Sequence, residues 1–186
     1  MVFFGSRRSH NAPFIPADTP AAEQVLRSAE YLGLDPSQTM LVGSAALCLY
    51  GVELDTYDRL TKQQRPRPSD LDYASTPLYM NQLARHGTPT GLQPQLKHTL
   101  NPRQTVLTIN TPEVPADIIT RFQPERDDLL SYHARFLAYL ERHSRPVEGT
   151  ALRIITQHAL IKELQRNSLD PKIAHDLSLA RRHFTR

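Results

Sequence analysis

Two aspartates with one residue between them are the first feature of this chain that could do chemistry. Asp70 and Asp72 lie in SDLDYAS, a segment that predicts a strand over residues 69–75. Alternate residues of a strand face the same side, so both carboxylates would share one face with their Cα atoms roughly 6.5–7 Å apart, while Leu71 and Tyr73 would face the core. A divalent cation would offset the repulsion between the two charges. Such a pair offers the oxygen ligands that Mg²⁺ prefers, and Mg²⁺ held in this way serves phosphoryl or nucleotidyl transfer.

A third carboxylate occurs in a later apolar segment. Asp117 interrupts VPADIITRF, which predicts a strand over residues 114–122. An acidic side chain in such a strand is costly unless it faces a site or a partner. If this strand lies beside the strand of Asp70 and Asp72, the three carboxylates converge on one metal site. The alternative is that Asp117 pairs with Arg121 or caps a turn.

A turn from strand to helix provides a candidate phosphate site. TMLVG predicts a short buried strand over residues 39–43, and SAALCLYG predicts a helix over residues 44–51. Gly43 would let a phosphate approach the backbone, and the hydroxyl of Ser44 and the first amides of the helix would donate hydrogen bonds to it. Gly-Ser and Asp-X-Asp are each weak signals, and their conjunction with the later aspartate is more specific.

Together these motifs resemble the DNA polymerase beta-type nucleotidyltransferase superfamily. Its pattern is Gly-Ser at a helix start, an Asp-X-Asp strand and a third acidic residue on a neighbouring strand. The lead RPSDLD is similar to the Arg-x-Ser/Thr segment before the aspartates in the abortive-infection, toxin-type branch of this superfamily. The residues of this sequence that carry the pattern are Gly43-Ser44, Asp70-Leu71-Asp72 and Asp117.

The last part of the sequence looks like the helical pair of the same branch. LIKELQRNSLDPKIAHDLSLARRH carries a lysine on its first helix and a Lys-x-x-His-Asp stretch on its second. The corresponding residues are Lys162, Lys172 and Asp176. Two of these residues also have a structural explanation, because Lys162 could extend from an apolar helix to solvent and Asp176 could stabilise the last helix against its neighbour.

The resemblance implies a mixed sheet of five strands or fewer, two Mg²⁺ (or Mn²⁺) ions, and transfer of a nucleoside monophosphate from an NTP to an acceptor hydroxyl. Asp70 and Asp72 would bind both ions, and Asp117 would hold the catalytic ion and help to deprotonate the acceptor. The acceptor would be tRNA or another RNA, a protein or a small molecule. Membership of this branch would make the protein a toxin of a toxin–antitoxin or phage-defence system, with an antitoxin as partner. The residues implied to contact the nucleotide are Gly43, Ser44, Arg67, Lys162 and Asp176.

Two other functions are open from the sequence. A catalytically inactive relative would serve as a binding module, as an interaction partner or an RNA-binding protein. A structural explanation of Asp70 and Asp72 is also open, in which they are solvated strand-end residues with Arg65 and Arg67 as surface partners. An antibiotic nucleotidyltransferase would need an acidic pocket for a cationic drug. Arginine supplies 18 of the 22 Lys and Arg residues, which is compatible with an RNA partner and also with a GC-rich genome. The acidic residues that would line a drug pocket lie in the polar segment 52–69 and are Glu53, Asp55 and Asp58.

The elements that must position these residues indicate an α+β fold, with a small mixed sheet, flanking helices and a C-terminal helical part. A further strand is predicted over residues 104–110, and helices are predicted over residues 19–32, 77–87, 125–143, 149–167 and 170–183. We divide the chain into a flexible arm (1–17), a nucleotidyltransferase core (18–125) and a helical part packed on that core (126–186).

Composition argues against several other classes. The chain has 186 residues and a formal charge of +3, and it contains no apolar run long enough to predict a membrane span. The order of residues in MVFFGSRRSH predicts no secretory signal, and the single cysteine, Cys48, predicts a cytoplasmic protein without an internal disulfide. The sequence also lacks a P-loop, a Gly-x-Ser-x-Gly motif and His or Cys pairs at zinc spacing.

Overall fold

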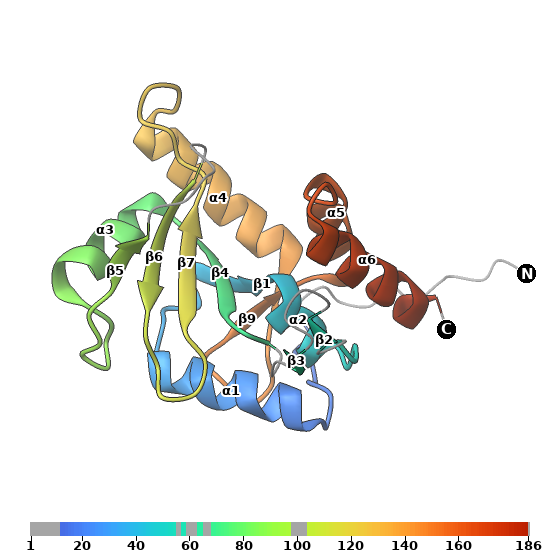
Figure 1. Cartoon of the computed structure of the whole chain (residues 1–186). Coiled ribbons are helices and arrows are strands. Elements are labelled where there is room, and N and C mark those ends of the chain that lie inside the picture. The colour runs from blue at the N-terminus through green and yellow to red at the C-terminus, as the bar shows by residue number, and fades with distance from the viewer. Residues whose placement is uncertain (1–11, 55–56, 59–62, 65–67, 98–103, 186) are drawn as a thin grey trace, which may run out of the picture.

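The structure is a computed structural model that describes residues 12–54, 57–58, 63–64, 68–97 and 104–185. Within these residues the chain forms a mixed sheet of seven strands in the order β5-β6-β7-β4-β1-β9-β8, with flanking helices (Figure 1). This architecture confirms the predicted α+β fold. The strands of the sheet are β1 (Thr39–Val42), β4 (Leu71–Ser75), β5 (Gln95–Lys97), β6 (Thr105–Ile109), β7 (Ala116–Thr120), β8 (Ser144–Pro146) and β9 (Arg153–Ile155).

A short hairpin and six helices complete the described part of the chain. The hairpin, β2 (Tyr57–Asp58) and β3 (Gln63–Gln64), lies in the polar segment 52–69, for which the sequence predicts a loop or a hairpin. None of the described helices combines the length and the apolar character that a membrane crossing requires. The helices are α1 (Pro20–Leu32), α2 (Gly43–Leu49), α3 (Pro77–His86), α4 (Leu129–His143), α5 (Gln157–Arg166) and α6 (Pro171–Phe184).

The boundaries of the first helices follow their capping residues. Thr19 accepts a hydrogen bond from the backbone N–H of Ala22, with Pro20 in the first turn, and Gly33 ends α1 in the left-handed conformation with φ 60°. Helix α3 begins in the same way, because the hydroxyl of Thr76 accepts from the N–H of Tyr79. Both helices occupy the ranges that the sequence predicts.

The two faces of the central strand β4 differ, because one is buried in the core and the other carries charge. Leu71 and Tyr73 are almost completely buried, as predicted for the core side of this strand. Asp72 and Ala74 alternate with them and point to the opposite face. In the view of Figure 1, α1 lies below the sheet and α4 above it, and α5 and α6 lie side by side at its right.

The prediction of one buried helix over residues 149–167 is wrong. Residues 153–155 form β9, which pairs with β1 in parallel and with β8 in antiparallel orientation, and only residues 157–166 form α5. Ile154 and Ile155 are both buried, because β9 lies inside the sheet and is covered on both faces. A strand of this kind is apolar without alternation, which is also the pattern of a buried helix. With β5, β8 and β9 included, the sheet has seven strands, more than the five that the resemblance implied.

The described end of the predicted N-terminal arm contacts the rest of the fold. The backbone N–H of Phe14 donates to the carbonyl of Pro146, and the N–H of Glu148 donates to the carbonyl of Phe14. The ring of Phe14 lies 4.7 Å from that of Tyr50, measured between centroids. Residues 12–17 therefore lie against β8 and the end of α2, whereas residues 1–11 lie outside the described residues.

Candidate functional site

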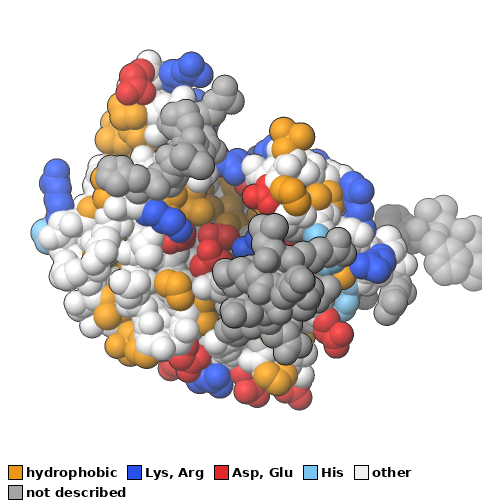
Figure 2. All heavy atoms as spheres, in the orientation of Figure 1, with side chains coloured by type: hydrophobic (Ala, Val, Ile, Leu, Met, Phe, Trp, Pro, Cys, Tyr) orange, Lys and Arg blue, Asp and Glu red, His pale blue; other side chains and the backbone are white. Residues whose placement is uncertain are grey.

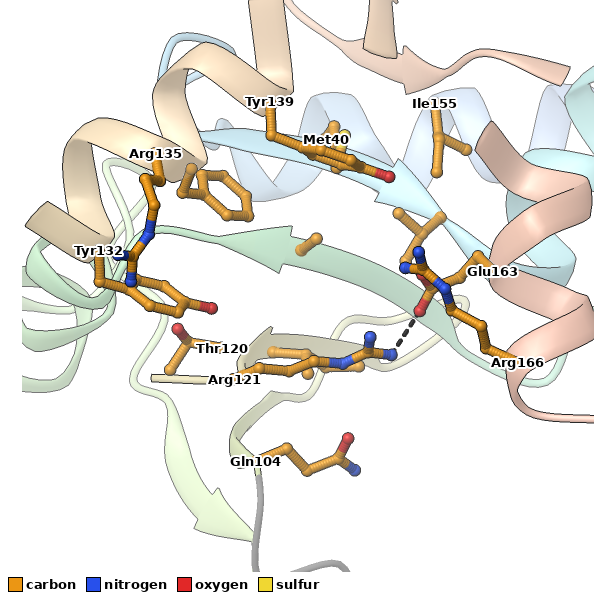
Figure 3. A pocket seen from close by; sticks show the side chains of 14 residues that line it. Met40, Gln104, Thr120, Arg121, Tyr132, Arg135, Tyr139, Ile155, Glu163 and Arg166 are labelled. Atoms are coloured by element: carbon orange, nitrogen blue, oxygen red, sulfur yellow. Dashed lines mark hydrogen bonds and ion pairs between the residues drawn. The ribbon is translucent and has the colours of Figure 1, made fainter. Parts of the chain in front are cut away.

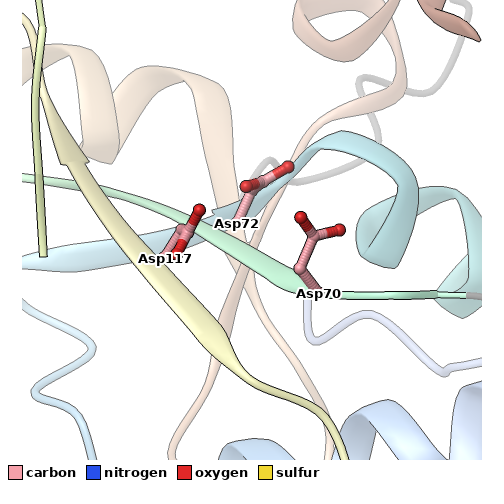
Figure 4. Close-up of side chains that lie close together, drawn as sticks. All are labelled: Asp70, Asp72 and Asp117. Atoms are coloured by element: carbon pink, nitrogen blue, oxygen red, sulfur yellow. The ribbon is translucent and has the colours of Figure 1, made fainter. Parts of the chain in front are cut away.

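The three aspartates that the sequence singles out converge on one face of the sheet (Figure 4). Asp70 precedes β4, Asp72 lies within β4, and Asp117 lies within β7. One carboxylate oxygen from each residue lies within 4.8 Å of the corresponding oxygens of the other two. This spacing allows one or two divalent cations to be bound by all three carboxylates.

Strand register explains the convergence. Strand β4 pairs with β7 in parallel orientation, and Asp72 lies opposite Asp117 in this pairing. Side chains opposite each other on neighbouring strands point to the same face, so these two carboxylates must be neighbours. Asp70 lies two residues before Asp72 and points to the same face by the alternation of the strand. The predicted adjacency of the two strands is therefore present in the structure.

Gly43 allows the carboxylate of Asp72 to approach the backbone at the end of β1. Val42 is the register partner of Asp72, and Gly43 follows it as the first residue of α2 with φ 65°. A Cβ atom added at Gly43 would lie 2.7 Å from Oδ2 of Asp72, a distance that carbon and oxygen atoms do not tolerate without a shift. The sequence assigned this glycine to phosphate contact, and the structure adds a second requirement for it at the carboxylate.

Asp117 is held by a lysine and a threonine that the sequence did not single out. The Nζ of Lys97, on the edge strand β5, donates to Oδ2 of Asp117 at 2.5 Å, and the hydroxyl of Thr108 donates to Oδ1 at 2.6 Å. Thr108 is the antiparallel register partner of Asp117, which places their side chains on the same face. The alternative that Asp117 pairs with Arg121 is not seen, because Arg121 forms an ion pair with Glu163.

The electrostatic environment of Asp72 disfavours its charged form. Burial, followed by the charges of Asp70 and Asp117, raises the pKa of Asp72 from 3.8 to about 7, against an opposing effect of Lys172 and Lys97. Like charges and loss of water both penalise the carboxylate, whereas a bound divalent cation favours it. The carboxylate cluster is therefore suited to exchange a proton for a metal ion near neutral pH.

The other described residues that the family resemblance names lie on α2, α5 and α6. Ser44 is buried in the first turn of α2, next to Gly43. Lys172, in the first turn of α6, is exposed and acts electrostatically on Asp72. Lys162 is exposed on α5, where it helps to lower the pKa of His143 after the larger effects of burial and Arg142. Asp176 is buried within α6, and Arg67 lies outside the described residues.

Figure 3 shows a cavity of about 360 Å³ that is lined by residues of the sheet and of α4 and α5. It lies on the face of the sheet that carries the aspartates, because Ala74 and Ile119 line it and alternate residues of a strand share a face. Its floor includes Ala74, two residues after Asp72 on β4, and Ile119, two residues after Asp117 on β7. These are the next positions on the same face of each strand, so the cavity begins beside the carboxylates. Helix α4 contributes aromatic side chains and α5 contributes charged ones. The residues that define the character of the lining are Tyr132, Phe136, Tyr139, Arg121, Arg135, Glu163 and Arg166.

The spacing of aromatic residues in the sequence is a signal for this cavity. Tyr132, Phe136 and Tyr139 recur at intervals of four and three residues, so they share one face of α4. Figure 2 shows the surrounding surface, where acidic side chains lie beside a hollow lined with hydrophobic groups and basic side chains lie around them. The face thus combines a carboxylate cluster, an aromatic cavity and peripheral cations.

Comparisons with protein families, characterised proteins and solved structures identified no match to this chain. The chemistry of the described residues therefore carries the functional argument. Three carboxylates provide the hard oxygen donors that fit Mg²⁺ or Mn²⁺, and Gly43 leaves room for the oxygen of Asp72 beside the backbone.

Proposed function

We propose that the protein is a nucleotidyltransferase that depends on Mg²⁺ or Mn²⁺. The observation that carries this proposal is the convergence of Asp70, Asp72 and Asp117 on one face, beside a cavity of about 360 Å³. The bound ions would neutralise charge on the phosphates of an NTP and on the acceptor oxygen. In this proposal Asp70 and Asp72 hold the ions, and Asp117 also accepts the proton of the acceptor hydroxyl.

The cavity supports the proposal because its size and lining suit the nucleoside part of a nucleotide. Binding pockets for small molecules begin at about 300 Å³, so the cavity of about 360 Å³ can hold a base and a sugar. Aromatic side chains such as Tyr132 and Tyr139 can stack on a base, a contact that contributes about 1–3 kcal/mol. The phosphates would then extend along β4 and β7 toward the aspartates.

The charges around the cavity favour an anionic acceptor, and we propose RNA. Among the described residues that line the cavity, Arg121, Arg135 and Arg166 are cationic, and Glu163, which pairs with Arg121, is the one carboxylate. Arginine binds phosphate through two parallel hydrogen bonds, which suits an RNA backbone. A cationic antibiotic would need the reverse charge pattern. Of the acidic residues expected to line a drug pocket, Glu53 is exposed, and the side chains of Asp55 and Asp58 lie outside the described residues.

Transfer of labelled nucleotide tests the proposed function. The protein is incubated with each α-labelled NTP in turn, with Mg²⁺ or Mn²⁺ and with total RNA or a protein lysate. Nuclease and protease digestion of the labelled product then identifies the acceptor class. We expect label on RNA from the wild type and from Asp18→Asn, a matched variant at an exposed aspartate, and none from Asp70→Asn or Asp72→Asn.

A contact inside the carboxylate cluster favours a second candidate function. Lys97 already neutralises part of the charge of Asp117, as expected of a nucleotidyltransferase fold that has no activity and serves as a binding module. The two candidates differ in the response to metal. An inactive module would give no label with any NTP, and its stability would not respond to Mg²⁺ or Mn²⁺.

A further inference from the structure

Lys97 and Thr108 each donate a hydrogen bond to one oxygen of the Asp117 carboxylate. Oδ1 of Asp117 accepts the hydroxyl of Thr108, a neighbour fixed by the register of β6 and β7. Oδ2 accepts the ammonium of Lys97 at 2.5 Å. Both oxygens of the carboxylate therefore have a donor, and only the lysine is a charged group at the end of a flexible side chain.

The two donors differ in how easily they can leave. Thr108 lies on β6, which pairs with a strand on each side, and its short side chain cannot leave Asp117 without a change of rotamer against β7. Lys97 lies on the edge strand β5, its side chain is about half exposed (49%), and four rotatable bonds connect its ammonium to the backbone. The side chain can therefore swing into solvent while β5 stays in place.

We propose that Lys97 is an exchangeable internal counter-ion of Asp117, which a divalent cation displaces when it binds to the three aspartates. The ammonium and the cation compete for the same oxygen, so the lysine lowers the metal affinity of the free protein. This inference rests on the metal-binding part of the proposed function. A permanent structural partner would differ from this lysine, because it would stay bound to Asp117 in both the metal-free and the metal-bound protein.

Titration of Mn²⁺ into the full chain, without nucleotide, measures this competition. Electron paramagnetic resonance reports the free ion and gives the dissociation constant directly. We expect Lys97→Met to bind Mn²⁺ on the order of tenfold more tightly than the wild type, because a charge-assisted hydrogen bond no longer opposes the ion. Lys97→Gln removes the charge but keeps polar atoms, and it should shift the affinity in the same direction.

Two further variants make the test specific. Lys97→Arg keeps the charge and can form two parallel hydrogen bonds to the carboxylate, so we expect it to bind Mn²⁺ no more tightly than the wild type. Arg27→Met removes an exposed cation that pairs with Glu23 and Glu113 on another surface, and it should leave the affinity unchanged. We therefore expect Lys97→Met to have a higher Mn²⁺ affinity than the wild type, and Lys97→Arg to have an affinity equal to or lower than that of the wild type.

Several results would overturn the proposal. Equal or weaker Mn²⁺ binding by the two neutral variants would show that Lys97 supports the site instead of competing for it. Absence of Mn²⁺ binding by every variant would remove both this inference and the metal-dependent function. If Lys97→Met binds Mn²⁺ more tightly but the wild type transfers no nucleotide, the counter-ion proposal is supported and only the proposed reaction is refuted.

Discussion

Replacement of Asp72 by asparagine should stabilise the metal-free protein, and the gain should depend on pH. The pKa of Asp72 is raised from 3.8 to about 7 by burial and by the charges of Asp70 and Asp117. Between these values the folded protein binds more protons than the unfolded chain, so the free energy of unfolding falls as pH rises through this window. Asparagine does not titrate, and the variant avoids this loss.

The expected size of the effect follows from the shift. A rise of the Asp72 pKa from 3.8 to about 7 lowers the free energy of unfolding by about 4 kcal/mol once the pH exceeds the pKa of the folded protein. Asp72 is partly exposed at the site, so water and salt reduce the repulsion that its replacement relieves. We therefore expect the free energy of unfolding of Asp72→Asn to exceed that of the wild type by about 1–3 kcal/mol at pH 8. At pH 5 the difference should be less than about 1 kcal/mol.

Urea denaturation in the presence of a chelator, at pH 5 and pH 8, measures both differences. Asp18→Asn is the matched control, because Asp18 is an exposed aspartate outside the site. Addition of Mn²⁺ should raise the stability of the wild type and of the control but not that of Asp72→Asn. A variant that is no more stable than the wild type at pH 8, or a gain that is the same at both pH values, would refute the reasoning.

Three other substitutions test the positioning of the site and its support. Gly43→Ala should lower the free energy of unfolding by about 1–3 kcal/mol in urea denaturation, because φ is 65° and the new Cβ would meet Asp72. Thr108→Val should cost about 1–2 kcal/mol in the same assay because a partly buried hydrogen bond is lost. It should also weaken Mn²⁺ binding measured by calorimetry, because the uncharged hydroxyl of Thr108 fixes the orientation of the Asp117 carboxylate. Leu160→Ala should cost about 2–5 kcal/mol and retain a single thermal transition, because this completely buried residue of α5 belongs to the common core.

The carboxylate cluster could be predicted from the sequence because each of its members has a local signal. Asp70 and Asp72 lie two residues apart in an apolar strand, and Asp117 interrupts another. Period-two alternation fixes the face of each side chain once its strand is recognised. The adjacency of β4 and β7 is not written in either segment. It was a condition of the predicted convergence and part of the family pattern, and the structure contains it, whereas the parallel orientation of the two strands was not predicted.

Two features could not be found by the same reasoning, for different physical reasons. Strand β9 is covered on both faces, so its apolar run has no alternation that distinguishes it from the helix that follows. Lys97 lies on a strand of three residues in a proline-bearing segment, and its contact with Asp117 spans two strand pairings. Thr108 was within reach, because a hairpin that joins the two predicted strands places it opposite Asp117.

The energetics of this face argue that it is maintained for a purpose other than stability. Neighbouring positions on the same face are apolar, as Val42, Ala74 and Ile119 show. An apolar residue at position 72 would avoid the desolvation and repulsion that raise the pKa of Asp72. The chain instead carries three carboxylates there, one of which pairs with Lys97. In the function that we propose, a multivalent cation would compensate the remaining charge. The expected signature of such a site is a free energy of unfolding that rises when Mn²⁺ binds. Without Mn²⁺, the free energy of unfolding should fall as the pH rises.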